Sequence, residues 1–147
     1  MAKLIDTCAH ELMDTAPQII QAIRVEMRRG RGSDISIPQF RTLAFIQRNP
    51  DSSLSNLAEH LGLTLPSVSK LVDGLVKQKL VIRQESTADR RRLTLVLTQA
   101  GASIVNSARA SAQANLAKKL DHLSYDELET IYQTMKLLRP IFVSQGR

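Results

Sequence analysis

The hydrophobic pattern predicts helices at both ends of the chain and a mixed segment between them. Apolar residues recur near helical spacing across residues 4–29, which predicts a first helix. Pro17 lies inside this run and cannot donate to the carbonyl four residues earlier, so we expect a kink there or a fresh helix start after Thr15. A second helix is expected to follow Pro38 and to end before Asn49.

Two short helices with a turn between them are expected next. Residues 54–61 carry one apolar stripe at positions i, i+3, i+4 and i+7, formed by Leu54, Leu57, Ala58 and Leu61. Gly62 suits a left-handed backbone in the turn, and Thr64 can cap a helix over residues 65–78. The buried face of that helix is expected to consist of Val68, Leu71, Val72, Leu75 and Val76. Two helices spaced in this way predict a helix-turn-helix.

After residue 79 the hydrophobic period changes from helical to two, which is typical of strands. Residues 80–85 and 92–98 are expected to pair as a hairpin with the polar sequence STADRR at its tip. In the second strand one face is expected to carry Leu93, Leu95 and Leu97, and the other Thr94, Val96 and Thr98.

Two more helices close the chain. Thr98 can cap a long helix that runs to about Leu120. Ser124 and Glu127 have the spacing of a capping box, which predicts a last helix to about Phe142.

The order of these elements predicts a fold that is mainly α with a small β-hairpin wing (α+β). A helix-turn-helix that is followed at once by a hairpin with a basic tip is a winged helix. We expect a single domain over residues 1–147, with the winged helix-turn-helix at 36–98 and helical parts at 1–30 and 99–147.

The charge of the chain is concentrated in the predicted winged helix. The whole chain has 147 residues and a formal net charge of +6. Residues 61–98 hold seven basic and three acidic residues, a net charge of +4, which leaves +2 for the rest. A basic surface of this kind favours an anionic partner such as nucleic acid. The alternative is that these charges form a solvated face without a partner. In that case the basic residues would coincide with the helix-turn-helix and the hairpin by chance.

Several kinds of function are disfavoured by what the sequence lacks. One cysteine cannot form an internal disulfide or a cysteine-based zinc site, and the three histidines are scattered. There is no glycine-rich phosphate loop and no GxSxG motif, so we expect no enzyme activity, no metal and no cofactor. The start of the sequence lacks a signal peptide, and no apolar run could cross a membrane, so we expect a cytoplasmic protein.

The wing carries a motif that identifies a family. The sequence DRRRLTLVLT at 89–98 matches the DxRxxxxxLT signature of the multiple-antibiotic-resistance regulator (MarR) family, and LAEHLGLTLPSVSKLVDGLVKQKLVIRQ resembles the helix-turn-helix of that family. The resemblance implies a homodimer in which the helices of 1–30 and 99–147 from both subunits interleave. It also implies that helix 65–78 enters the major groove of double-stranded DNA.

The same resemblance assigns residues to DNA contact. On helix 65–78 and the wing these are Pro66, Ser67, Ser69, Lys70, Lys77, Arg90 and Arg92. Lys70 suits guanine or phosphate, whereas Ser67 and Ser69 can bond several bases and specify little alone. Arg90 resembles the residue that members of the family insert into the minor groove. Asp73, Asp89 and Arg91 are expected to be structural, because Arg91 can pair with either aspartate and hold the wing in shape.

The first helix departs from some branches of the family. Cys8 lies near the position of a reactive cysteine in peroxide-sensing members, but the only tyrosines, Tyr125 and Tyr132, are in the last helix, so we expect Cys8 to be buried and inert. Members of the family often bind a small phenolic or lipophilic anion. His10, Arg24 and Arg41 can face such an effector, although nothing in the sequence identifies one.

The expected function is therefore sequence-specific DNA binding by a dimeric transcriptional regulator, with repression as the favoured mode and a pseudo-palindromic operator. Two alternatives remain open. One is a protein-interaction module that keeps the winged helix as a scaffold, and the other is an architectural DNA-binding protein without an effector.

Overall fold

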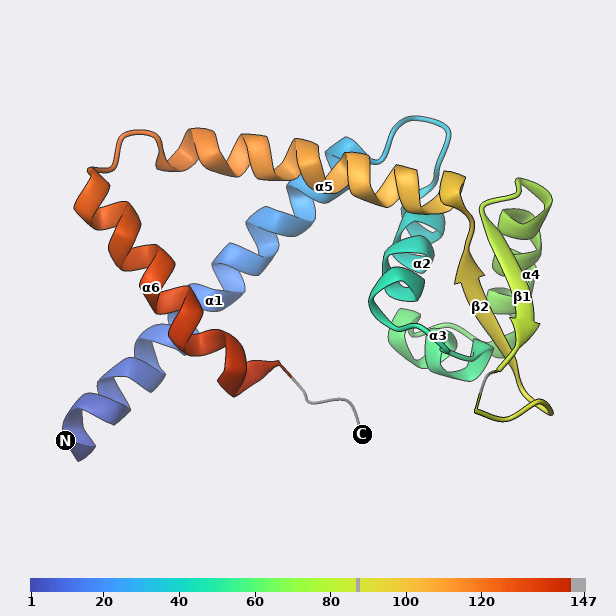
Figure 1. Cartoon of the computed structure of the whole chain (residues 1–147), viewed down its shortest axis with the longest axis horizontal. Coiled ribbons are helices and arrows are strands. Elements are labelled where there is room, and N and C mark those ends of the chain that lie inside the picture. Colours follow the sequence, from blue (N-terminus) through green and yellow to red (C-terminus); the bar gives the residue numbers. More distant parts are fainter. Residues whose placement is uncertain (87, 144–147) are drawn as a thin grey trace. The chain divides into compact units, whose positions relative to one another are not determined.

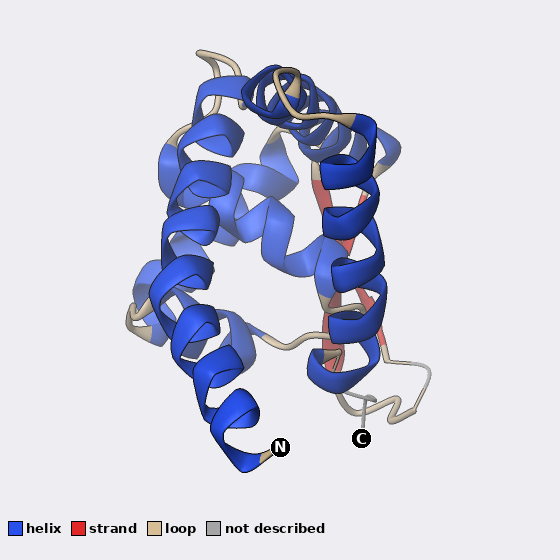
Figure 2. Cartoon of the chain, turned by 90° about the vertical axis from the view of Figure 1, so that its left-hand side faces the viewer, coloured by secondary structure: helices blue, strands red, loops and turns tan. Residues whose placement is uncertain are grey.

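The computed structural model describes residues 1–86 and 88–143 (Figure 1). The elements follow one another as α1 (Ala2–Gly30), α2 (Ile37–Arg48), α3 (Leu54–Leu61), α4 (Leu65–Lys77), β1 (Val81–Glu85), β2 (Leu93–Leu97), α5 (Gln99–Leu120) and α6 (Tyr125–Phe142). Among the described residues the antiparallel hairpin of β1 and β2 is the only β structure, which Figure 2 shows in red. The prediction of a mainly helical fold with a hairpin wing is confirmed. The chain forms two compact units, Met1–Ala112 and Gln113–Arg147.

The first helix is longer and more regular than the sequence suggested. α1 continues through Pro17, so the fresh helix start expected after Thr15 is wrong. Proline removes one hydrogen bond to the carbonyl of Met13, and Met13 lies on an exposed stretch where water can satisfy that carbonyl. Cys8 is exposed, which corrects the expectation that it is buried. None of residues 1–11 is buried, because no other part of this unit covers the start of α1.

The helix-turn-helix begins and ends where its capping residues predict. The side chains of Ser53 and Thr64 accept hydrogen bonds from the backbone N–H groups of Asn56 and Ser67, which cap α3 and α4. Gly62 ends α3 in the left-handed region at φ 67°, as expected for the turn. The resulting short loop places α3 and α4 against one another.

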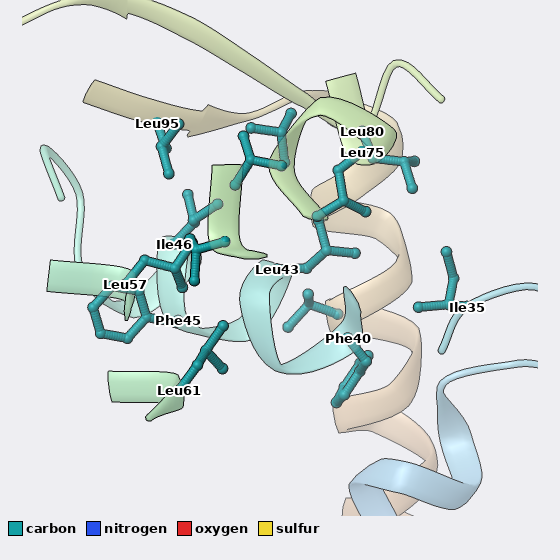
Figure 3. Close-up of a cluster of buried hydrophobic side chains, with 14 of the residues drawn as sticks. Ile35, Phe40, Leu43, Phe45, Ile46, Leu57, Leu61, Leu75, Leu80 and Leu95 are labelled. Atoms are coloured by element: carbon teal, nitrogen blue, oxygen red, sulfur yellow. The ribbon is translucent and has the colours of Figure 1, made fainter. Parts of the chain in front are cut away.

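The core of the first unit lies between α2, α3, α4, the hairpin and the first half of α5 (Figure 3). Leu43, Leu57 and Leu75 are fully buried in it, one each from α2, α3 and α4. On α4 the buried positions are Val68, Val72 and Leu75, which leaves the opposite face of that helix exposed. This amphipathic division fixes which side chains of α4 are available to a partner.

The hairpin does not alternate as simply as its sequence suggests. Val81 pairs with Leu97 and Arg83 with Leu95, and Leu95 reaches the core. Leu93, however, is 58% exposed, whereas Thr94 is fully buried and donates from Oγ1 to the carbonyl of Gln84. Leu93 lies at the outer end of β2, where the wing extends beyond the residues that form the core.

The start of α5 is fastened to the turn between α4 and β1. Oγ1 of Thr98 donates to the carbonyl of Lys79 at 2.7 Å and accepts from the N–H of Gly101 at 3.1 Å, which confirms the predicted cap. Gly101 lies so close to the backbone of Leu80 that a side chain would collide with the Leu80 carbonyl. The hairpin and α5 are thereby anchored at one point.

The second unit contains the end of α5 and all of α6. The capping box of Ser124 and Glu127 is formed as expected, and its hydrogen bonds lower the pKa of the Glu127 carboxyl. α6 has no buried residue, although many of its side chains are apolar. Residues 144–147 lie outside the described part of the chain.

Candidate nucleic-acid interface

The exposed side of α4 carries the residues that were expected to touch DNA. Pro66, Ser67, Lys70 and Lys77 are exposed, and Ser69 is half-buried. They alternate with the buried positions Val68 and Val72, so the helical period itself turns them outward. Their contact with DNA stays a prediction.

The hydroxyl groups at the start of α4 are already engaged with one another. Oγ1 of Thr64 donates to Oγ of Ser67 at 2.9 Å and also accepts from the N–H of Ser67. Pro66 has no N–H to offer. Thr64 therefore uses its hydroxyl proton within the turn, whereas the O–H of Ser67 is still available to donate to a ligand.

The tip of the wing is shaped by a set of local hydrogen bonds. Oγ of buried Ser86 accepts from the N–H groups of Ala88 and Asp89, and the N–H of Ser86 donates to the carbonyl of Arg92 at 2.8 Å. Oδ1 of Asp89 accepts from the N–H of Arg91 at 3.0 Å. Asp89 therefore orders the turn through the backbone of Arg91. Thr87, part of the expected tip, lies outside the described residues.

The ion pair expected for Arg91 is replaced by another. Asp73 pairs with Arg83 of β1, with Nη2 at 2.6 Å from Oδ1, and not with Arg91. Arg83 faces inward from β1, opposite Leu95, and so reaches α4, whereas Arg91 belongs to the exposed tip. The expectation that the Arg91 side chain pairs with Asp73 or Asp89 is therefore wrong for the described residues, and Asp89 instead accepts from the backbone N–H of Arg91. The alternation of side chains along β1 was the signal in the sequence that could have identified Arg83.

The basic side chains of α4 and the wing tip are free of acidic partners. Within residues 1–86 and 88–143, no ion pair involves Lys70, Lys77, Arg90, Arg91 or Arg92. All five are exposed. Their charge is therefore available to phosphate groups, for which unpaired lysine and arginine are the usual protein ligands.

The charges of several arginines act on His60, a residue that the sequence did not single out. The imidazole ring of His60 stacks on Phe45 of α2, with ring centroids 4.6 Å apart. Partial burial, followed by the charges of Arg41, Arg48 and Arg24, lowers the pKa of His60 below its ordinary value of 6.5. Two of the three residues expected to face an effector, Arg24 and Arg41, thus act electrostatically on His60. His10, the third, contacts Asp14 one turn along α1.

No group of three or more histidine, cysteine, aspartate or glutamate side chains lies together as metal ligands would in the part of the chain that is described. None of the described helices is both long enough and apolar enough to cross a bilayer.

The helix-turn-helix, the hairpin and their exposed basic residues define a winged helix-turn-helix protein. The sequence profile of the MarR family matches residues 33–92, which include α2, α3, α4, β1 and the wing tip. This winged-helix part of the chain therefore resembles the MarR family, as the wing motif predicted.

Known proteins have similar sequences and folds. The chain is 29% identical over 105 residues to the uncharacterized HTH-type transcriptional regulator YfiV of Bacillus subtilis (strain 168), which covers 71% of the chain and 66% of YfiV. The chain therefore spans slightly less than two thirds of that relative. The fold is similar to that of the transcriptional regulator Tm0710 from Thermotoga maritima, with a TM-score of 0.76 at 23% identity over 90% of this chain and 94% of Tm0710.

Structures of S. aureus MepR are also similar. A MepR mutant bound to an oligodeoxyribonucleotide gives a TM-score of 0.55 at 24% identity, and covers 95% of this chain and 96% of its own. MepR bound to ethidium bromide gives a TM-score of 0.59 at 26% identity and covers 96% of both chains.

Proposed function

We propose that this protein is a homodimeric transcriptional regulator that binds double-stranded DNA in the cytoplasm and represses by occluding a promoter. The observation that carries the proposal is the set of exposed, unpaired basic side chains on α4 and the wing tip. α4 enters the major groove with Pro66, Ser67, Ser69, Lys70 and Lys77, while Arg90 and Arg92 reach the adjacent backbone and minor groove.

The relatives support the DNA-binding part of the proposal. YfiV is described as a transcriptional regulator of the helix-turn-helix type, and a MepR mutant was crystallised with an oligodeoxyribonucleotide. The matched region of the MarR family, residues 33–92, contains α4 and the wing tip. The proposed DNA contacts thus lie within the segment that matches the family profile.

Exposed apolar side chains on the terminal helices support the homodimer. On α1 these include Leu4, Ile5, Met13, Ile19 and Ile20, and on α6 Leu128, Tyr132, Met135, Leu137, Ile141 and Phe142. An extensive apolar surface of this kind is costly in water and marks an interface. Residues 1–30 and 99–147 therefore serve dimerisation. Together with the winged helix-turn-helix of the same subunit they make up a single domain. A two-fold axis implies a pseudo-palindromic operator with half-sites about 10 base pairs apart.

A small anionic or phenolic effector completes the proposal. Arg24, Arg41 and Arg48, whose charges act on His60, provide positive charge, and the His60 ring provides an aromatic surface. An effector bound to the dimer would change the separation of the two α4 helices and release the DNA.

The test is a fluorescence-anisotropy titration with the duplex upstream of the protein's own gene, at ~0.15 M salt, against a scrambled duplex. A specific regulator is expected to prefer the first duplex by ~10³-fold or more. With about 8 phosphate contacts per dimer, log K is expected to fall with log salt at a slope of about −7. Equal, weak binding to both duplexes would favour an architectural protein. Absence of binding would favour a protein-interaction module. Sedimentation analysis checks the dimer, and a promoter–reporter assay distinguishes repression from activation.

A further inference from the structure

The first turn of α4 exposes an apolar surface at the end of the helix that is directed at DNA. Leu65, the first residue of α4, is 50% exposed, and Leu63 before the cap is 44% exposed. Pro66 follows on the same exposed turn. By contrast Val68, one turn further along, has no exposed surface at all.

Packing within the chain explains Leu63 better than it explains Leu65. Leu63 precedes the Thr64 cap and has the position from which a side chain packs against the fourth residue of the helix, here Val68. Leu65 does not have this position, and like Leu63 it lies outside the set of buried and partly buried residues that form the core. Half of the Leu65 surface thus remains in contact with water in the folded chain.

The side chains of the first two residues of α4, Leu65 and Pro66, have no polar group with which to read a base by hydrogen bonding. Next to them, the hydroxyl of Thr64 uses its proton to bond to Oγ of Ser67, so the O–H of Ser67 is the side-chain donor that this turn still offers. The N-terminal residues of a recognition helix are those that meet base edges in the major groove. Here that position offers carbon atoms, which can distinguish bases only by an apolar contact.

Thymine is the base that presents an apolar group in the major groove, its 5-methyl. We propose that Leu65, together with Pro66, recognises thymine in each half-site by packing against this methyl group. Leu65 is then a specificity-determining residue. The inference rests on the proposed DNA-binding function and adds to it the chemistry of the base that is read.

The experiment removes the methyl group from the DNA and the side chain from the protein. A duplex enriched by the protein from a random pool is synthesised with each thymine in turn replaced by deoxyuridine, which keeps base pairing and lacks only the methyl. Affinity of the wild-type protein is expected to fall about three- to fivefold at one or two positions of each half-site. Leu65→Ala is expected to bind the unmodified duplex more weakly and to be insensitive to deoxyuridine at those positions.

Two further variants make the result specific. Ile82→Ala shortens another apolar side chain, which is 45% exposed on β1, and is expected to retain the deoxyuridine effect. Leu65→Met keeps most of the apolar volume of the side chain and is expected to retain part of the deoxyuridine effect. Denaturation midpoints of the variants check that each protein folds.

Each other outcome overturns the inference in a recognisable way. If a specific duplex is enriched but no thymine can be distinguished from deoxyuridine, the inference fails and the proposed function stands. If Leu65→Ala keeps the full deoxyuridine effect, another residue reads the methyl group. If Leu65→Ala changes the oligomeric state, the side chain belongs to a protein interface. If the pool yields no duplex at all, the proposed function fails as well.

Discussion

Nη2 of Arg83 lies 2.6 Å from Oδ1 of Asp73, and this ion pair joins the first strand of the wing to α4. The arginine side chain is 29% exposed and that of the aspartate 56%. A pair with this exposure contributes little to global stability. The ion pair instead helps to orient β1, the strand that leads to the wing tip, relative to α4, the helix that carries Lys70.

Breaking this ion pair is expected to weaken DNA binding without removing a phosphate contact. Arg83→Gln should lower the free energy of unfolding by less than about 1 kcal/mol and reduce affinity for the operator. The slope of log K against log salt should stay as in the wild type, because Arg83 is neutralised by Asp73 in the folded protein. In a double-mutant cycle, Arg83→Gln in the Asp73→Asn background should cost less than it does alone. A salt slope that decreases by about 1 would instead make Arg83 a phosphate ligand.

Truncation of an arginine at the wing tip is expected to act differently. Arg90→Ala should weaken operator binding by about 1–3 kcal/mol, mainly through minor-groove positions, and lower the magnitude of the salt slope by about 1. Arg109→Ala, which removes an exposed arginine from α5, is the matched control and should leave binding unchanged. The measurement is the same anisotropy titration at several salt concentrations. Equal effects of the two substitutions would mean that only net charge matters.

Two glycines are expected to respond in opposite directions to the same substitution. Gly101→Ala should lower the free energy of unfolding by about 1–3 kcal/mol, because the new Cβ collides with the backbone carbonyl of Leu80. Gly74→Ala in α4 should raise it by about 0.5–1 kcal/mol, since no atom lies within 4 Å of its added Cβ and alanine favours the helix. Urea denaturation of both variants checks this. Destabilisation by both would contradict the packing described around α4.

The histidine beside Phe45 is expected to make stability dependent on pH. The pKa of His60 is lower in the folded protein than its ordinary value of 6.5, so the unfolded chain binds the proton more tightly. The stability that neutral His60 provides is thus complete above about pH 6.5 and decreases as the pH falls toward its folded pKa. His60→Gln should lose less stability than the wild type between pH 8 and pH 5. Urea denaturation at both values measures the difference, and an equal loss in the two proteins would contradict this account.

Features that depend on neighbours within four residues could be predicted from the sequence alone. The caps at Thr64, Thr98 and Ser124 and the left-handed turn at Gly62 are all found where the sequence predicts them. These features follow from hydrogen bonds and backbone preferences that act locally. Hydrophobic periods of 3.6 and 2 likewise identified α2, α3, α4 and the hairpin, because each of these elements buries part of its surface in the core.

Contacts between residues of different elements could not be predicted from the sequence, because they depend on how the elements pack. Asp73 pairs with Arg83 rather than Arg91, because the inward face of β1 lies against α4 while the wing tip does not. Leu93 is exposed although it is apolar, since the core ends before the tip of the wing. The partner of Asp73 and the exposure of Leu93 depend on how far the helices cover the hairpin. The sequence of a single helix or strand does not contain this information, because it arises only when the elements pack together.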